Sequence, residues 1–322
     1  MKIKKLSSDF TPLHEGVIFD IDTEATTPSD IEVKIIEIAT GEIVATQLLR
    51  NTVRATINIA PYVKIPTVYA PAPQSQTTFS EAPTSSYKVR IGDIESESVV
   101  VSVNRSKVDS SPAVLTALPS SRRLFKNEND ELLIVTDRGS TLYAEIVADT
   151  GESLHLEYFT SSGAATLSLS TQSFETMVRA LDVTLYCDEG EIGSFHYKVT
   201  PRHQATARLA WLSDCGAIEH YTFATSYRAK RSAKREIVTT SEGVVSASCR
   251  AKQSLSLSSH IEPQATIEAL AQIASSPKVW MEVDGGWHLV EVVTPSIEYN
   301  LFGEPSYILL EICLWQKEVA LW

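Results

Sequence analysis

Alternating apolar and polar residues run through much of the chain, with the two-residue period of strands that bury one face. The first series contains IEVKIIEI from Ile31, a turn at Gly41, IVATQLL and VRATINIA, and it resumes later with YKVRIGDI and ESVVVSVN. Short turns between such segments favour antiparallel pairing in two packed sheets. The pattern therefore predicts a small β-sandwich domain over residues 1–108.

A stretch rich in proline, serine and threonine interrupts this first series at residues 66–86. Proline has no backbone N–H to donate to a neighbouring strand, so a segment that repeats it pairs poorly in a sheet. The stretch is also longer than most connections within a domain. We therefore expect residues 66–86 to form a long loop or arm.

The alternation returns with ELLIVTD, LYAEIVAD, SLHLEYFT and AATLSLS, which are separated by turns at Gly139 and Gly151. The segment VTLYCDEGEIGSFHYKVTP then reads as a hairpin that reverses near Gly190. Regular turn signals of this kind predict a second antiparallel β-sandwich over residues 109–204. The stretch SFETMVRAL fits either a helical turn or a strand connection, and its pattern leaves both open.

The composition changes after this second series, because all five tryptophans follow it. Residues 263–275 predict a helix, since a proline suits its first turn and Ile267, Leu270 and Ile273 fall on one face. VWMEV, two glycines and WHLVEVV then form a hairpin pattern. We predict an α+β domain over residues 205–322, with an antiparallel sheet and one short helix, so that the whole chain is mainly β.

Charge and length narrow the class of protein. The 322 residues exceed what a single core usually organises, and the net charge of −12 would repel a phosphate backbone, so nucleic acid is disfavoured as a partner. No apolar run is long enough to cross a membrane, and the first residues lack the apolar stretch of a signal peptide. We expect cytoplasmic synthesis without a membrane span, with a virion as the alternative final location.

Catalytic motifs are missing from the sequence. It contains no GxGxxG, P-loop, GxSxG or HExxH pattern, and its four cysteines lack a CxxC pair. Asp214, Cys215 and His220 lie within seven residues, but strand alternation favours a histidine packed at a sheet surface. We therefore expect no enzyme, no cofactor and no metal. A hydrolase remains as an alternative that would need two carboxylates facing one cleft.

The run YRAKRSAKRE is the first candidate interaction site. Five basic residues precede its one acidic residue, and they are Arg228, Lys230, Arg231, Lys234 and Arg235. A solvated loop or strand face is the first interpretation of such a run, and an acidic protein partner is the second. Nucleic acid ranks third, because no aromatic residue follows Tyr227 in the run to stack on bases.

Tryptophans supply the second set of candidates. Trp280 and Trp287 flank the predicted hairpin turn and would serve as stacking platforms for a glycan if their rings were exposed. Trp322 is the last residue of the given sequence and would dock into a neighbouring subunit or into its own domain. In each case a buried core anchor is the competing interpretation.

A resemblance adds to this picture. The stretch AWLSDCGAIEHYTF, from Ala210 to Phe223, resembles a W-L-N-x-x-G-G-x-(D/E)-x-(Y/W)-x-F signature of uncharacterised β-rich proteins of Bacteroidetes phages and prophages. SPKVW from Ser276 and GWHLV from Gly286 resemble the later parts of the same pattern. Ser213 and Ala217 depart from it, and the second departure puts a glycine-dependent turn in doubt. The resemblance implies a tail- or virion-associated structural role and no catalytic residues.

Two functions from different classes follow. The first is a structural subunit of a phage, prophage or phage-like particle, such as a tail, baseplate or connector component, that forms a homo-oligomer or assembles with other particle subunits. The alternative is a module that binds glycans or a cell surface. The hydrolase ranks behind both.

Overall fold

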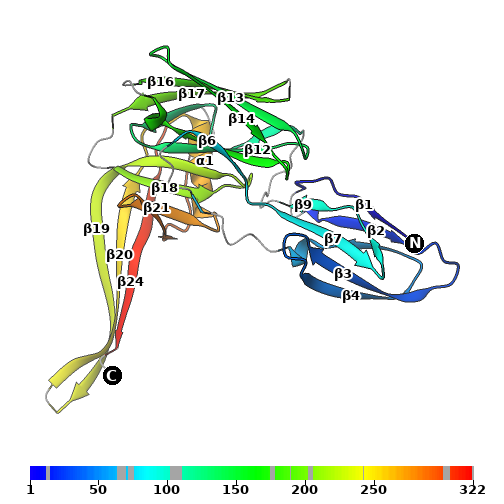
Figure 1. The fold of residues 1–322 in the computed structure, drawn as a ribbon. Coiled ribbons are helices and arrows are strands. Elements are labelled where there is room, and N and C mark those ends of the chain that lie inside the picture. The colour runs from blue at the N-terminus through cyan, green and yellow to red at the C-terminus, as the bar shows by residue number, and fades with distance from the viewer. Residues whose placement is uncertain are drawn as a thin grey trace.

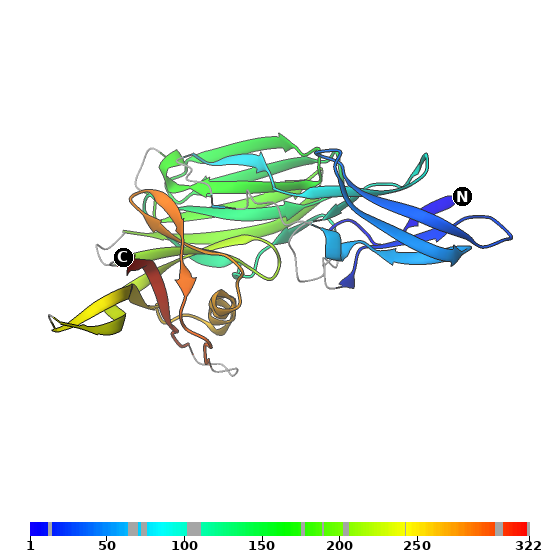
Figure 2. The same ribbon diagram turned by 90° about the horizontal axis from the view of Figure 1, so that it is seen from below.

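A computed structural model of the chain describes residues 1–11, 15–63, 70–71, 76–101, 111–174, 178–188, 190–201, 206–241, 243–299 and 305–320, with the backbone alone at 225–228, 250 and 314–320. In Figure 1 the first residues form a separate lobe on the right, and a long ribbon of strands projects from the main body at the lower left. Figure 2 shows the layers of the body from below, with the helix beneath the sheets.

Two sheets form the N-terminal lobe. One contains β1 (Lys2–Lys5), β2 (Ile18–Asp22) and β5 (Arg54–Asn58), and the other contains β4 (Ile43–Thr52), β3 (Ser29–Glu37), β7 (Ser85–Ile91), β8 (Ile94–Glu95) and β9 (Val99–Val101). Apolar residues of both sheets share one core, and Ile31, Val33 and Ile35 of β3 contribute every second side chain to it. The lobe is therefore a sandwich built on the predicted alternation.

A second pair of sheets packs around its own core. One sheet has the order β10 (Ala113–Leu115), β12 (Asn129–Val135), β15 (Ala164–Ser170) and β6 (Thr78–Glu81). The other has the order β11 (Ser121–Phe125), β17 (Gly190–Thr200), β16 (Ala180–Cys187), β13 (Thr141–Ala148) and β14 (Ser153–Phe159). β11 pairs with β17 in parallel, which departs from an otherwise antiparallel arrangement.

The C-terminal part is one sheet with a short helix against it. The strand order is β22 (Gly286–Leu289), β21 (Val279–Val283), β18 (Thr206–Leu212), β19 (Ile218–Thr240), β20 (Gly243–Ser258), β24 (Leu309–Ala320) and β23 (Glu291–Val292). Helix α1 (Gln264–Ala271) continues into a 3-10 turn at Gln272–Ala274, and Ile267, Leu270 and Ile273 are buried against the sheet. The predicted helix is thus present, and Pro263 occupies its N-cap position without a side-chain hydrogen bond.

The predicted fold class is confirmed, because the chain is mainly β, with several antiparallel sheets and one short α-helix among the described residues. Two further 3-10 turns lie at Ala60–Tyr62 and Thr171–Ser173. In the undecided stretch SFETMVRAL, residues 175–177 lie outside the described part, and its last two residues begin β16. None of the described helices is long and apolar enough to span a membrane.

The expectation of a loop or arm at residues 66–86 is wrong for its second half. Thr78–Glu81 is strand β6, which pairs antiparallel with β15 and inserts Phe79 into the core of the second sandwich. Residues 76–82 contain no proline, so every backbone N–H there can donate to a neighbouring strand. Residues 64–69 and 72–75, which hold two of the prolines, lie outside the described residues.

Candidate functional site: a projecting basic arm

The most distinctive surface of the molecule is an arm, which we define as residues 225–255 of β19 and β20. β18 pairs with β19 only as far as Ala224, so β19 continues beyond the body with β20 as its partner. β24 pairs with β20 from Ser248 to Ser258 and supports the upper part of the arm. Figure 1 shows these strands reaching well away from the sandwiches, and the tip is two-stranded.

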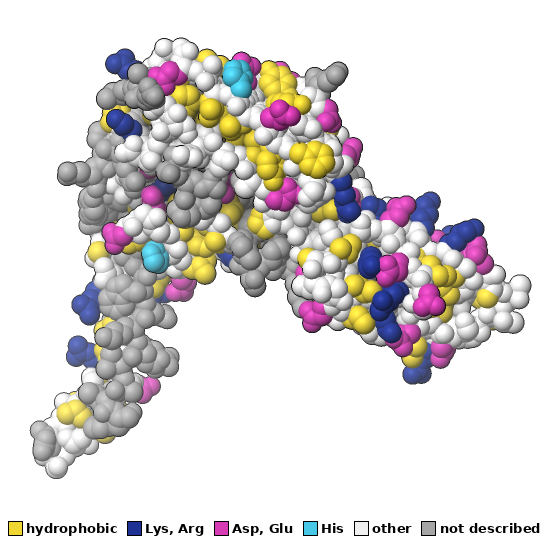
Figure 3. Space-filling model, viewed as in Figure 1, with side chains coloured by type: hydrophobic (Ala, Val, Ile, Leu, Met, Phe, Trp, Pro, Cys, Tyr) yellow, Lys and Arg dark blue, Asp and Glu magenta, His cyan; other side chains and the backbone are white. Residues whose placement is uncertain are grey.

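The arm places the predicted basic run on an exposed strand. Lys230, Arg231, Lys234 and Arg235 are all exposed, and Lys and Arg side chains stand out from the arm in Figure 3. The side chain of Arg228 lies outside the described part of the chain, although its backbone belongs to β19. The structure therefore brings the run together as one strand, in agreement with the interpretation of a solvated strand face.

Charge separates the arm from the rest of the protein. Residues 225–255 contain seven Lys and Arg and two Glu, which gives the arm a net charge of +5. Because the whole chain carries −12, the other residues together carry −17. Oppositely charged surfaces attract one another over about 8–10 Å at moderate salt, so the arm favours an acidic surface.

Like charges face each other within the arm. The strand register pairs Lys234 on β19 with Arg250 on β20. Like charges directly opposite on neighbouring strands destabilise a sheet. Lys252 has an ion pair to Glu291 at 3.0 Å, but this pair is exposed to solvent and contributes little. On its other side Arg250 is opposite Glu318 of β24 in the register, so the chain itself balances the positive charge of the arm only in part.

The tip of the arm, residues 236–247, exposes apolar side chains. Ile237 is 66% exposed, Val238 is 45% exposed and Val244 is 69% exposed. No second sheet layer lies against this two-stranded tip in either ribbon view. Exposed apolar side chains grouped beside charges are typical of an interaction surface.

The tryptophan candidates behave differently. Trp280 is only 3% exposed, so its ring offers no open face to a sugar, because it packs with Ala210, Leu212 and Ile218. Trp287 is half-buried and lies 5.3 Å from the ring of His220. Trp322 lies outside the described residues. The proposed role of Trp280 as a stacking platform is therefore wrong, and Trp287 is left as the one described candidate of the three.

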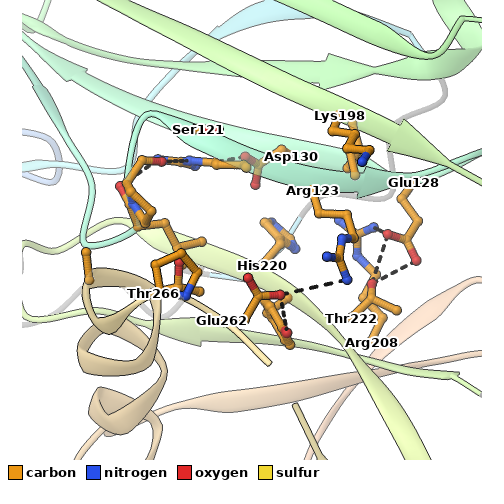
Figure 4. A pocket seen from close by; sticks show the side chains of 17 residues that line it. Ser121, Arg123, Glu128, Asp130, Lys198, Arg208, His220, Thr222, Glu262 and Thr266 are labelled. Atoms are coloured by element: carbon orange, nitrogen blue, oxygen red, sulfur yellow. Dashed lines mark hydrogen bonds and ion pairs between the residues drawn. The ribbon is translucent and has the colours of Figure 1, made fainter. Parts of the chain in front are cut away.

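A cavity of about 300 Å³ lies where the second sandwich meets the C-terminal sheet. Ionisable side chains from several elements line this cavity (Figure 4). They come from β11, β17, β18 and β19, from the start of β12 and from Glu262. Arg123 lies 3.9 Å from Glu262, whose carboxylate also accepts a hydrogen bond of 2.9 Å from the hydroxyl of Tyr221. The alternation of the sequence did not indicate this convergence, because the residues come from segments far apart in the chain.

Two buried guanidinium groups neutralise the carboxylates of the cavity. Arg208 Nη1 lies 2.8 Å from Glu128 Oε2, and its Nη2 donates to the carbonyl of Asn129. Arg122 Nη1 lies 2.8 Å from Asp130 Oδ2, which also accepts a hydrogen bond from Tyr197. The first ion pair joins residues that are 80 positions apart in the sequence, and the second joins residues that are 8 positions apart.

Some polar atoms of this cluster are closed off from solvent. Asp130 Oδ1, Arg208 Nε and His220 Nδ1 have no hydrogen-bond partner among the described residues. A molecule in the cavity could reach these atoms only if neighbouring side chains moved aside. The cluster is therefore built as a joint between the second sandwich and the C-terminal sheet rather than as an open binding site.

Glu219 and Asp130 show opposite electrostatic behaviour. Burial is the largest effect on Glu219 and raises the pKa of its carboxyl, although it accepts hydrogen bonds from Ala117 N at 2.5 Å and Thr116 Oγ1 at 2.8 Å. Burial also acts to raise the pKa of Asp130. The charge of Arg122, the interaction with His220 and two hydrogen bonds all lower this pKa, and together they outweigh burial, so the net shift is downward. The protein therefore accommodates charge at Asp130 and disfavours it at Glu219.

Replacing Glu219 by glutamine should change how stability depends on pH. Because the folded pKa of Glu219 lies above its ordinary value of 4.5, the wild-type protein loses stability as the pH rises from 4.5 through the folded pKa. Glutamine has no such proton to lose, so the stability of the variant should increase relative to that of wild type as the pH rises over this range. Urea unfolding of both proteins at about pH 4 and about pH 7 measures the change.

The control for this experiment is the exposed residue Glu97. Glu97→Gln should leave the stability difference from wild type nearly the same at both pH values, because the carboxylate is in water. If Glu219→Gln also gave the same difference at both pH values, burial would not control the protonation of Glu219.

The possible cluster of Asp214, Cys215 and His220 does not form a metal or nucleophile site in the described residues. Burial raises the pKa of the Cys215 thiol to about 11, which leaves little reactive thiolate at neutral pH. His220 Nε2 lies 3.5 Å from Glu131 instead. The turn before His220 uses Gly216 at a φ of 84°, so Ala217 needs no glycine conformation.

Comparisons with known proteins give no family. No protein-family model and no curated protein sequence matches this chain. Similar solved structures include domains 4–9 of the surface layer protein SbsC, at 8% identity and a TM-score of 0.24, with 78% of this chain and 44% of that chain covered. The FN1–FN3 domains of chicken CNTN1 match at 8% identity and a TM-score of 0.21, with 80% and 91% covered.

A variant of Salmonella alpha-2-macroglobulin also matches, at 10% identity and a TM-score of 0.22, with 99% of this chain and 26% of that chain covered. The chain thus spans less than half of the length of the surface layer fragment and about a quarter of the macroglobulin. Likenesses at these TM-scores carry no argument about function. The comparisons therefore leave the arm and the cavity to be interpreted from their own geometry.

Proposed function

We propose that this chain is a structural subunit of a phage or phage-like particle that acts through protein–protein contacts made by its arm. The observation that carries the proposal is the arm itself, which exposes like charges and an apolar tip on strands that have no second layer. Such a surface costs free energy in the isolated chain and would be stabilised by a partner.

The assignment to a phage particle rests on the sequence resemblance of residues 210–223 and 276–290 alone. A tail, baseplate or connector component remains the expected type of subunit. The geometry of the arm supports an assembly role in general, because a projecting hairpin can reach a neighbouring subunit that the body does not touch.

A catalytic role for the cavity is not part of this proposal. Its carboxylates already have cationic or hydrogen-bonding partners, since Glu128 pairs with Arg208, Asp130 with Arg122 and Glu262 with Tyr221. Trp280 is buried and cannot serve as a stacking platform for a glycan, and the ring of His220 lies against Trp287. The arm is the better supported functional surface.

Making the arm tip polar should remove the chain from assembled particles. We expect the wild-type chain to sediment with particles from a producing culture, and we expect the triple variant Ile237→Ser, Val238→Ser and Val244→Ser to remain in the soluble fraction. Each serine removes an apolar contact that would be worth about 1 kcal/mol or more when buried. Quantitative immunoblotting of gradient fractions measures the shift.

A matched control uses exposed apolar residues away from the arm. Ile43 is 43% exposed and Leu48 is 53% exposed on β4, and serine at both positions should leave sedimentation with particles unchanged. A wild-type chain that never enters the particle fraction would overturn the particle assignment. A tip variant that sediments like wild type would show that the arm is not the contact.

A further inference from the structure

We propose that the arm of one copy of this chain adds to strand β14 of a second copy, so that basic β19 lies beside acidic β14. This inference rests on the proposed function, because it names the partner of the same arm. Three features of the molecule point to this partner: opposite charge, two open strand edges and a matching spacing of side chains.

Acidic residues outnumber basic ones on the outer face of the sheet that contains β14, where Lys198 of β17 and Arg123 of β11 also point outward. Glu145, Glu157 and Glu191 lie on the side of this sheet that faces away from the core, and none of them makes an ion pair among the described residues. Asp182 on the same face pairs with His196 at 2.7 Å. An arm with a net charge of +5 is attracted to such a face.

Both partners have an open strand edge. β14 is the last strand of its sheet and pairs only with β13 in the described part of the protein. Among the described strands β19 pairs only with β20 from Arg228 to Thr240, so its other edge presents backbone donors and acceptors that no described strand pairs with. Two such edges can join through backbone hydrogen bonds and extend one sheet into the other.

The side chains on these edges have matching spacing. Arg235 and Ile237 are two residues apart on β19, so they share one face at a separation of about 7 Å. Glu157 and Phe159 have the same separation on β14 and point outward. Ile237 is 66% exposed and Phe159 is 62% exposed. In a parallel alignment Arg235 meets Glu157 while Ile237 covers Phe159.

An acidic group also lies on the inner side of β14. The hydroxyl of Tyr158 donates to Glu81 Oε2 at 2.9 Å, and Glu81 belongs to β6, the edge strand of the facing sheet. Lys230 and Lys234 alternate with Arg231 and Arg235 along β19, so they would lie on this inner side when the edges pair. Both faces of the added strand would therefore meet carboxylates.

A simpler explanation of the lysines is that charge on an edge strand prevents unspecific pairing. This explanation covers β19 but not Arg250 and Lys252, because they belong to β20, which is flanked by β19 and β24. It also does not account for the apolar tip. The other long edge strand, β4, carries Arg50 and no acidic residue, so charge favours β14 as the acceptor.

A contact between the arm and β14 joins two different surfaces of the same chain. Such a head-to-tail contact leaves a free arm at one end and a free β14 at the other. Repetition then closes a ring or grows a filament, and either product suits a particle subunit. A two-fold dimer satisfies the same contact only if both arms reach the partner's β14 at once.

The inference can be tested with purified full-length protein and four charge variants. The arm variant reverses Lys230→Glu, Arg231→Glu, Lys234→Glu and Arg235→Glu. The acceptor variant reverses Glu145→Lys and Glu157→Lys, and the matched control reverses the exposed pair Asp93→Lys and Glu97→Lys. The fourth protein combines the arm and acceptor changes in one chain. Sedimentation velocity with increasing protein concentration gives the mass of each species.

We expect wild type and control to self-associate, and we expect the arm and acceptor variants each to associate about 100-fold more weakly. An equimolar mixture of these two variants pairs the intact arm with the intact β14 and the reversed arm with the reversed β14, so it should associate into mixed species of at least twice the 35.4 kDa chain mass. The combined variant should recover self-association, because its charges are exchanged. Raising the salt from about 0.01 M to about 1 M should weaken the wild-type contact.

Other outcomes would overturn the inference in distinguishable ways. A chain that stays monomeric but sediments with particles would refute the second copy as partner and leave the proposed function intact. Loss of association in the arm variant without recovery of association in the mixture would refute β14 as the acceptor. Binding of a random DNA duplex by wild type but not by the arm variant, without self-association, would point to nucleic acid instead.

Discussion

Replacing Arg208 by alanine is expected to lower the free energy of unfolding by about 3–5 kcal/mol. Arg208 is 2% exposed and pairs with Glu128, which is 4% exposed. The substitution leaves the carboxylate of Glu128 buried with the hydroxyl of Thr222 as a hydrogen-bond donor at 2.9 Å but without its cation. A carboxylate in that position has lost its water and its main counter-charge. Urea unfolding followed by tryptophan fluorescence measures the loss.

Two comparison variants separate the buried charge from simple loss of a side chain. Lys88→Ala breaks the exposed pair with Glu95 and should cost about 0.2–1 kcal/mol. The double variant Arg208→Met with Glu128→Leu removes both charges and should recover much of the stability. If Arg208→Ala cost no more than Lys88→Ala, the pair would not hold the second sandwich to the C-terminal sheet.

Replacing Trp211 by alanine should also cost about 3–5 kcal/mol and loosen the root of the arm. Trp211 is fully buried on β18, and the strand register places it opposite Glu219 at the start of β19. Alanine leaves a cavity between the sheet and helix α1, whose residue Ile267 belongs to the same core. Thermal unfolding gives the global loss, and hydrogen exchange in β19 reports the local loosening.

Trp211→Phe is the matched control for this cavity. Phenylalanine fills most of the volume and removes the indole N–H, which has no hydrogen-bond partner among the described residues. We expect a cost below about 1.5 kcal/mol for this substitution. A similar loss for Phe and Ala would indicate that the exact shape of the indole, and not the cavity, controls stability.

Strand positions could be predicted because many strands bury one face. In β3, Ile31, Val33 and Ile35 are buried, and Glu32 between them is exposed. The same period located β13, β16 and the hairpin of β21 with β22. Helix α1 followed from its apolar spacing, although it is shorter than residues 263–275 because the last turn is a 3-10 turn.

The buried charge cluster could not be predicted in this way. Alternation placed His220 and Thr222 on one face of β19 and Glu219 and Phe223 on the other, and both faces proved to be buried. The reason is that β19 starts between the second sandwich and helix α1. Arginine and glutamate are usually exposed, so a single sequence gives no sign that Arg208 meets Glu128 from another segment.

The length of the arm could not be predicted from the sequence either. Lysine and alanine have low strand preference, so YRAKRSAKRE gave only a solvated loop or strand face. The 23 residues of β19 are held in one strand by pairing with β20, which in turn pairs with β24 from the end of the chain. Propensity is local, whereas this strand depends on distant segments.

Strand β6 follows the N-terminal lobe in the sequence, but it is part of the second sandwich and not a simple linker. It supplies the outermost strand beside β15, from Ala165 to Ser168, and it seats Phe79 in the neighbouring core. A chain shortened to residues 109–322 would therefore expose the backbone amides and carbonyls of β15 that pair with β6, and it would leave a cavity in the core where Phe79 packs. Such a fragment would tend to aggregate, whereas a truncation that keeps residues 76–82 covalently attached would preserve the closed edge.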